Sequence, residues 1–166
     1  MFTIEIFTGP RFGLRRLFEE ADDSSKAIET YIDNGEVLVA REAEGGLVGH
    51  VQLIPGASEW EIKSLAVVPS WRGRGVGSAL VQAALERAIS RGAGRVVVAT
   101  ATADTGNIRF YQRLGFRMNR IEPDAFTPER GYPTVSVDGI PLRDRVWFSI
   151  QVNPDHSGPD IPGGRE

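Results

Sequence analysis

A glycine-rich turn between two apolar runs limits the folds open to this chain more than any other stretch. Residues 65–68, Leu-Ala-Val-Val, indicate the end of a strand that Pro69 stops, and residues 79–85 indicate the start of a helix. Between them, residues 72–78 read Arg-Gly-Arg-Gly-Val-Gly-Ser, here called the glycine turn. Alternate glycines remove the Cβ atoms that keep a ligand from the backbone, and the first N–H groups of a helix lack partners within the helix. The glycine turn therefore predicts a phosphate site, with added charge from Arg72 and Arg74.

Two well-known phosphate motifs do not fit the glycine turn. A dinucleotide fingerprint starting at Gly73 needs a third glycine where the chain has serine, and an acidic residue about twenty positions on, where it has arginines. A nucleotide P-loop ends in Gly-Lys-Ser/Thr, and the glycine turn holds no lysine. The pattern that fits is Arg-x-x-Gly-x-Gly, formed by Arg72, Gly75 and Gly77. The alternative is an ordinary strand-to-helix turn, in which glycine and arginine are common.

The Arg-x-x-Gly-x-Gly pattern is similar to the pyrophosphate-binding motif of the GNAT superfamily of acyl-CoA-dependent N-acyltransferases. Residues 111–116, Tyr-Gln-Arg-Leu-Gly-Phe, resemble the same family's Tyr-x-x-x-Gly-Phe. These motifs fall within residues 59–116, while the element order agrees over residues 2–152. A block from residue 125 to 145 resembles a poorly characterised bacterial subgroup of the family, which names no substrate.

Hydrophobic periodicity predicts the order of elements. Strands are expected at residues 2–7, 37–40, 47–53, 59–68, 96–99, 116–121 and 145–152, and helices near residues 14–18, 24–32, 76–91 and 108–114. This order, βααβββαβαββ, matches the GNAT arrangement, which implies an α/β fold with a mixed, mostly antiparallel sheet and helices on both faces. Residues 135–140 indicate a small hairpin. We expect a single domain over residues 1–152 and a disordered tail over residues 153–166.

Composition excludes several classes of function. The chain has 166 residues and a formal net charge of −3, which argues against a general nucleic-acid or membrane-surface binder. It has no cysteine, which removes disulfides, cysteine metal sites and a cysteine-linked acyl intermediate, and its two histidines argue against a histidine metal site. No run is long enough for a membrane span and the first residues lack the basic start of a signal peptide, so we expect the cytoplasm.

The resemblance implies an acid for the leaving thiolate. Tyr111 corresponds to the family tyrosine near the coenzyme sulfur, and a phenol with a pKa of about 10 can protonate a thiolate whose acid has a pKa of about 8.5. The alternative is that Tyr111 packs with Phe110 and Phe116 in the core.

The base is assigned less directly. Glu61 aligns with a glutamate that several family members use to deprotonate the amine, and Glu59 shares its strand face. Either carboxylate can act directly or through water, and a water chain alone is the third option. The family would polarise the acyl carbonyl with a backbone N–H, expected here at Val67, where the family's sheet splays open to admit the pantetheine arm.

The resemblance also implies the coenzyme contacts. They are Leu65, Ala66, Val67, Arg72, Gly73, Arg74, Gly75, Val76, Gly77, Ser78 and Asn107. The family commonly has asparagine seven residues before the tyrosine, where this chain has Asp104. Either Asp104 serves as a helix cap alone, or Asn107 reaches the pantetheine from a shifted position.

The resemblance implies an N-acetyltransferase that moves an acetyl group from acetyl-CoA to a primary amine of a small molecule or peptide. Direct attack in a ternary complex is the expected route, without a metal, and a homodimer is possible. The alternative is a non-catalytic acyl-CoA-binding sensor. Residues 19–23 and 122–129 hold seven carboxylates against Arg130 and are expected at the substrate mouth, which favours a cationic acceptor unless these charges only solubilise two loops.

Overall fold

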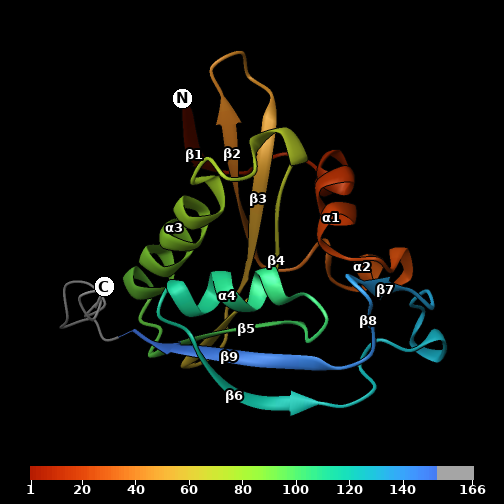
Figure 1. Ribbon diagram of the computed structural model, residues 1–166. Coiled ribbons are helices and arrows are strands. Elements are labelled where there is room, and N and C mark those ends of the chain that lie inside the picture. Colours follow the sequence, from red (N-terminus) through yellow and green to blue (C-terminus); the bar gives the residue numbers. More distant parts are fainter. Residues whose placement is uncertain (153–166) are drawn as a thin grey trace, which may run out of the picture.

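The computed structural model describes residues 1–152, and the tail expected at residues 153–166 lies outside the described residues. Seven strands in that range form one sheet in the order β1-β2-β3-β4-β5-β9-β6 (Figure 1). Their bounds are Phe2–Ile6 (β1), Glu36–Glu42 (β2), Leu47–Ile54 (β3), Glu59–Val67 (β4), Arg95–Ala101 (β5), Arg117–Glu122 (β6) and Arg145–Gln151 (β9). β4 and β5 pair in parallel and the other neighbours are antiparallel. The mixed, mostly antiparallel sheet is thus confirmed, with β7 (Ser136–Val137) and β8 (Ile140–Pro141) as the small hairpin.

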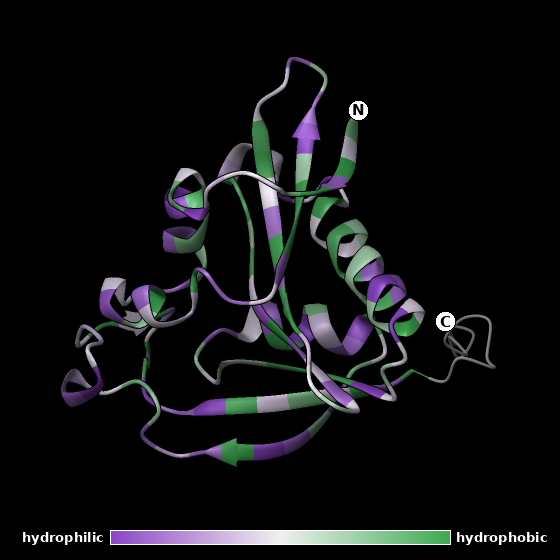
Figure 2. Ribbon diagram, turned by 180° about the vertical axis from the view of Figure 1, so that it is seen from behind, coloured by the Kyte–Doolittle hydropathy of each residue, from purple (hydrophilic) through white to green (hydrophobic). Residues whose placement is uncertain are grey.

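Helices cover both faces of the sheet. They are α1 (Arg15–Ala21), α2 (Ser25–Tyr31), α3 (Val76–Ser90) and α4 (Thr105–Arg113). Successive side chains of a strand point to opposite faces, and on β2 the residues Leu38 and Ala40 join a core with α3 while Val37 and Val39 join a core with α1 and α2. The same alternation of buried and more exposed residues runs along β9, whose ribbon changes between hydrophobic and hydrophilic colours (Figure 2).

Helix α4 starts earlier than the sequence pattern indicates. The expected start is Ile108, whereas the helix begins at Thr105. The reason is the Asp104 side chain, whose carboxylate accepts a hydrogen bond from the Asn107 N–H at 2.9 Å and caps the first turn. Gly106 therefore lies inside the helix instead of before it.

The sheet separates where β4 and β5 stop pairing. Their ladder joins Glu59–Ile62 to Arg95–Val98, and each strand then continues without pairing to the other. In Figure 1, β2, β3 and β4 lie roughly upright, whereas β5, β9 and β6 lie roughly horizontal. This gap between the upper part of β4 and the end of β5 is called the β4–β5 opening.

A β-bulge shapes the middle of β4. Gln52 of β3 pairs with Ser64, but the next residue, Leu53, pairs with Ile62. Lys63 is therefore the extra residue, and the alternation of side chains changes phase at this point. Because of this change, Lys63 and Ser64 both line the same cavity, described below.

Candidate functional site

The glycine turn leads directly into α3 and leaves its backbone accessible. Gly73 and Gly75 have φ angles of +72° and +80°, in the left-handed region that glycine adopts without strain, and Gly75 is the N-cap of α3. A Cβ atom at either position would meet no atom within 4 Å. The predicted open surface over the first turn of α3 is thus present in the structure.

A cavity of about 600 Å³, called the first cavity, lies against this turn. Ten of the eleven predicted coenzyme residues line it: Leu65, Ala66, Val67, Arg72, Gly73, Gly75, Val76, Gly77, Ser78 and Asn107. Arg74 is the one predicted residue that is not among the residues lining this cavity; its guanidinium lies 5.1 Å from the centre of the ring of Trp71, which does line it. The first cavity therefore brings together nearly the whole predicted set.

Arg72 has partners that the sequence did not indicate. Its Nε donates to the Val67 carbonyl at 2.9 Å, and its Nη2 donates to the Glu20 carboxylate of α1 at 3.1 Å. The guanidinium thus ties the glycine turn to β4 and to α1, and a phosphate bound there would compete with Glu20. No local pattern could reveal this pair, because 52 residues separate the two side chains.

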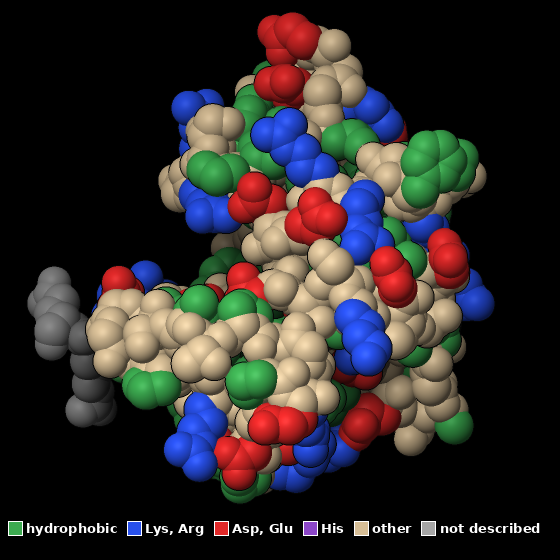
Figure 3. Space-filling view, turned by 90° about the vertical axis from the view of Figure 1, so that its right-hand side faces the viewer, with side chains coloured by type: hydrophobic (Ala, Val, Ile, Leu, Met, Phe, Trp, Pro, Cys, Tyr) green, Lys and Arg blue, Asp and Glu red, His purple; other side chains and the backbone are tan. Residues whose placement is uncertain are grey.

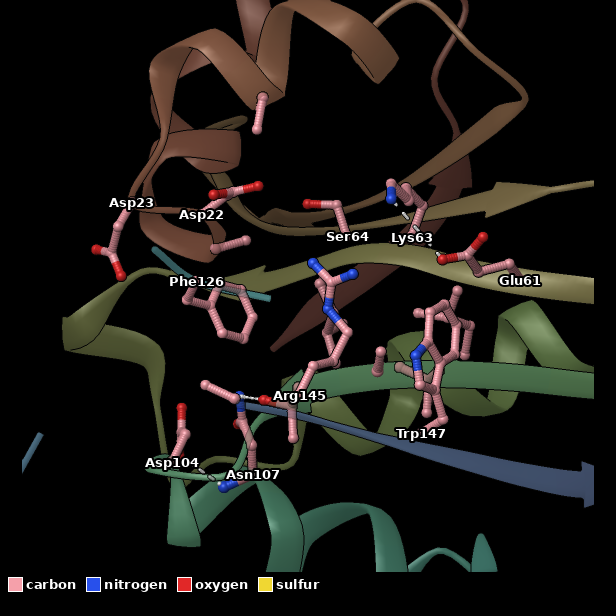
Figure 4. Close-up of a pocket in the computed structure, with 18 of the residues that line it drawn as sticks. Asp22, Asp23, Glu61, Lys63, Ser64, Asp104, Asn107, Phe126, Arg145 and Trp147 are labelled. Carbon is pink, nitrogen blue, oxygen red and sulfur yellow. Dashed lines mark hydrogen bonds and ion pairs between the residues drawn. The ribbon is translucent and has the colours of Figure 1, made fainter. Parts of the chain in front are cut away.

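A second cavity, of about 280 Å³, adjoins the first (Figure 4). The two share Leu65 on β4 with Asp104 and Asn107 at the start of α4, beside the β4–β5 opening, and also Ala21 and Asp23 at the end of α1. The other walls of the second cavity come from the α1–α2 connection with Asp22, from α2, β4, β5, α4 and β9, and from the segment between β6 and β9. A ligand in the first cavity can therefore reach a ligand in the second through the opening.

Backbone N–H groups of β4 face this junction. The Val68 N–H donates to the Val48 carbonyl of β3 at 2.9 Å. Because N–H groups of a strand point alternately to its two sides, those of Val67 and Leu65 point away from β3, toward the β4–β5 opening. They are free of the β4–β5 ladder, which ends at Ile62. The predicted Val67 donor thus lies beside a space that a ligand can occupy.

Tyr111 packs in the core and also borders the second cavity. Its ring packs edge to face with Phe110 and Phe116, at centroid distances of 5.1 and 5.7 Å, and the residue is 4% exposed. It also lines the second cavity. Burial, with the negative charge of Asp104, raises the pKa of Tyr111 above its ordinary value, so the phenol stays protonated at neutral pH.

Glu61 and Glu59 have different surroundings. Glu61 lines the second cavity, and its Oε1 lies 3.9 Å from the Lys63 ammonium. Burial raises the pKa of Glu61, and the nearby cation Lys63 partly offsets that rise. The Glu59 carboxylate instead pairs with Arg95, and Glu59 is not among the residues that line the second cavity. Of the two candidate bases, Glu61 is the one that faces the second cavity.

Asp104 and Asn107 divide the roles left open by the sequence. Asp104 caps α4, as described above, and the Asn107 Nδ2 donates to the Thr100 hydroxyl at 3.2 Å. Both residues line both cavities. The junction of the two cavities thus does have an asparagine, Asn107, but it lies about one helical turn after position 104, where the family pattern has its asparagine.

The carboxylates of residues 19–23 and 122–129 meet more cations than Arg130. Glu19 pairs with Arg15 on the same helix, and arginines from distant parts of the chain form the pairs Glu20–Arg72, Asp124–Arg143 and Glu122–Arg145. Asp22 instead accepts a hydrogen bond from the Tyr31 hydroxyl at 2.8 Å. Figure 3 shows acidic and basic side chains interspersed over this side of the molecule. Four of the seven carboxylates are thus paired with arginines, while Asp22 and Asp23 line the second cavity.

Within residues 1–152, no helix has both the length and the hydropathy of a membrane span. The described residues also contain no group of three or more His, Cys, Asp or Glu side chains placed to hold a metal ion.

Comparison with known proteins gives consistent matches. The family model described as "Acetyltransferase (GNAT) family" matches residues 5–116. The uncharacterized N-acetyltransferase YvbK of Bacillus subtilis is 31% identical over 133 residues, which cover 80% of this chain and 84% of YvbK. A mycothiol acetyltransferase of Clavibacter sepedonicus is 32% identical over 96 residues, 58% of this chain and 32% of that enzyme.

Solved structures share the fold over nearly the whole chain. An IAA acetyltransferase from Bacillus cereus superposes with a TM-score of 0.83 at 28% identity, covering 92% of this chain and 100% of that one. A Bacillus subtilis acetyltransferase in complex with CoA has a TM-score of 0.82 at 27% identity, with the same coverage.

Proposed function

The chain belongs to the acetyltransferase (GNAT) family, and from this premise we propose that it moves an acetyl group from acetyl-CoA to a primary amine of a small molecule or peptide. The observation that carries the proposal is the meeting of two cavities at the β4–β5 opening. One cavity contains the glycine turn and the other contains Tyr111 and Glu61. A donor and an acceptor can thus be held side by side, as a reaction between two substrates requires.

The first cavity is the proposed acetyl-CoA site. The pyrophosphate would lie on the N–H groups of the glycine turn and the first turn of α3, where the helix dipole favours negative charge. The pantetheine arm would enter the β4–β5 opening beside Asn107, and the Val67 N–H would polarise the thioester carbonyl. The related Bacillus subtilis structure in complex with CoA supports this choice of coenzyme.

The proposed reaction is direct attack in a ternary complex. The neutral amine attacks the thioester carbonyl carbon, the new C–N bond forms, and the C–S bond breaks. Glu61 takes the proton that the amine loses, directly or through water, and the Tyr111 hydroxyl gives a proton to the departing thiolate. The chain has no cysteine to carry the acetyl group covalently, so a single transfer between bound substrates is the simplest route.

The proposal extends to the setting of the reaction. We assign it to a single domain over residues 1–152 in the cytoplasm, either as a monomer or as a homodimer, without a nucleic-acid or membrane partner. The alternative, a non-catalytic acyl-CoA sensor, requires the first cavity alone. The second cavity, with an acid and a base beside the opening, favours the enzyme over the sensor.

Turnover with an amine panel tests the proposal. Released CoA can be measured with a thiol reagent without background from the protein, which has no cysteine, and mass spectrometry identifies the acetylated amine. Tyr111→Phe keeps the buried ring and removes the acid, so we expect kcat to fall by about 10²–10⁴-fold with unchanged acetyl-CoA affinity. Wild-type turnover in this variant would make Tyr111 a packing residue. Tight acetyl-CoA binding without transfer to any amine would favour the sensor.

A further inference from the structure

Two cations enter the second cavity from opposite walls. Lys63 comes from the bulge of β4, and Arg145 comes from the first residue of β9. In Figure 4 the Arg145 side chain extends from β9 across the cavity toward Ser64, and the Lys63 ammonium lies on the same wall as Ser64. The lining of the cavity also includes the carboxylates of Asp22, Asp23, Glu61 and Asp104, so Lys63 and Arg145 form a local cationic group within a cavity of mixed charge.

The Arg145 guanidinium is held in place with one edge open. Its Cζ lies 4.9 Å from the centre of the Phe126 ring, which supports the flat face of the group. Among the described residues, its hydrogen bond runs from Nη1 to Glu122 at 3.2 Å. Nε and Nη2 are left to bind a ligand, and two parallel donors of this kind fit the two oxygens of a carboxylate.

The Ser64 hydroxyl supplies a third donor, because its contact with the buried His50 ring leaves the hydroxyl proton free for the cavity. Its Oγ lies 2.8 Å from Nε2 of His50, which is fully buried, and Nδ1 of His50 has no hydrogen-bond partner. Burial lowers the pKa of His50 to about 3, so the ring is neutral and carries one proton. A proton on Nδ1 would leave a buried donor unpaired, which proteins avoid more strictly than an unpaired acceptor. The proton therefore belongs on Nε2, where it is donated to Ser64, and the Ser64 hydroxyl proton is left for the cavity that Ser64 lines.

Lys63 completes the group without a close ion pair. Its ammonium lies 5.0 Å from the centre of the Tyr31 ring and 3.9 Å from Glu61, the limit of an ion-pair distance. An ammonium in this position retains most of its capacity for a second anion.

We propose that Lys63, Ser64 and Arg145 form a carboxylate-binding subsite, and that the acceptor is a small amine that also carries a carboxylate, such as an amino acid. This inference rests on the proposed function, because it names the acceptor of that reaction. The cavity volume of about 280 Å³ suits a small molecule, and Phe126 and Trp147 offer apolar walls for its body. A positive charge placed at the subsite, such as the second charge of a polyamine, would lie against Lys63 and Arg145, so the subsite itself favours an acceptor with a carboxylate.

A binding experiment tests the subsite without turnover. N-acetyl derivatives of glycine, leucine and phenylalanine, and their carboxamides, are titrated by calorimetry into the protein saturated with CoA. We expect at least one acid to bind about 10- to 100-fold more tightly than its amide, which is the range for hydrogen bonds to a charged group. Arg145→Gln should abolish this preference, Lys63→Met should reduce it, and Arg145→Lys should restore part of it. Equal binding of acids and amides, or binding of neither, would overturn the subsite.

Arg120→Gln is the matched control. Arg120 stacks on Trp147 at 4.8 Å but is not among the residues that line the second cavity, so its loss should leave the preference for acids unchanged. Circular dichroism and CoA affinity of each variant exclude misfolding as the cause of any change. If Arg120→Gln lowers the preference as much as Arg145→Gln does, general surface charge explains the binding and the subsite is rejected.

Kinetics separate this inference from the proposed function. With amino acids and their amides as acceptors, Arg145→Gln should raise KM for the acids and leave KM for the amides and kcat nearly unchanged. Acids that bind through Arg145 without being acetylated would retain the subsite and reject the transferase. Amides acetylated as well as acids, in both the wild type and the variant, would retain the transferase and reject the subsite.

Discussion

The carboxyl group of Glu61 lies in surroundings that favour its protonated form. Its side chain is 28% exposed, and burial raises its pKa although the cations Lys63 and Arg145 act in the other direction. A group whose pKa is raised by folding binds its proton more tightly in the folded state than in the unfolded state. Ionised Glu61 therefore weakens the fold as pH rises past the unfolded pKa, and this ionised form is the one that a base requires.

Glu61→Gln should accordingly separate activity from stability. We expect the variant to lose the acid limb of the kcat/KM profile and about 10²–10⁴-fold in rate, while its melting temperature at pH 7–8 rises because no charge is buried. Glu59→Gln is the control, since the Glu59 carboxylate pairs with Arg95 and is not among the residues lining the second cavity. An unchanged acid limb in Glu61→Gln would move the base to a water chain.

Single residues differ in how far the sequence could locate them. The position of Tyr111 could be predicted because its motif is local: it begins on α4 and ends at Phe116, just after that helix. The role of Arg145 could not be predicted, because the residues that form the proposed subsite with it, Lys63 and Ser64, lie on β4, about eighty positions earlier in the sequence. Contacts between charged side chains so far apart in sequence depend on how the elements pack, and the hydrophobic periodicity of a sequence does not predict that packing.

At the scale of elements, the glycine turn combines an unusual backbone with an open surface. Gly45, in the β2–β3 hairpin, provides a comparison: its φ is +93°, and a Cβ there also meets no atom within 4 Å. Valine at Gly75 or Gly45 should cost a similar free energy of unfolding, about 1–3 kcal/mol, because both positions need a left-handed backbone. Gly75→Val should in addition weaken acetyl-CoA binding by about tenfold or more, whereas Gly45→Val should not. Calorimetric titration and thermal melts measure both effects, and equal affinities in the two variants would remove the phosphate role of the turn.

Periodicity predicted the elements, but only the family resemblance indicated that the sheet opens near Val67. Alternating and helical spacings located all seven strands of the sheet and its flanking helices, with shifts of a few residues at their ends. The β4–β5 opening and the bulge at Lys63 depend on the register between strands. A strand has the same period of two whether or not its neighbour continues beside it, so the single sequence gives no sign of where pairing stops.

At the scale of the molecule, the opening leaves two parts of the sheet joined through a short ladder. β1 to β4 lie on one side and β5, β9 and β6 on the other. Acetyl-CoA in the first cavity would contact the glycine turn from the first part and Asn107 from the second. Such a ligand binds the folded state and not the separated parts, so it stabilises the arrangement by mass action.

We therefore expect a large thermal shift with coenzyme. At a concentration of 100 times Kd, stabilisation of about 2.7 kcal/mol corresponds to a rise in melting temperature of about 5–10 °C for a chain of this size. Differential scanning fluorimetry with acetyl-CoA and CoA measures it, and hydrogen exchange should slow at the ends of both β4 and β5. Protection confined to one side of the opening would contradict a ligand that bridges it.

The walls of the second cavity have a consequence for how such proteins diverge. The family model matches up to residue 116, whereas Phe126, Arg145 and Trp147 all follow that point. The stretch that holds the glycine turn and Tyr111 is therefore separate in the gene from much of the stretch that meets the acceptor. Mutations in the later stretch can change the acceptor without altering the coenzyme site, so lineages that inherit the same turn are free to acquire different substrates.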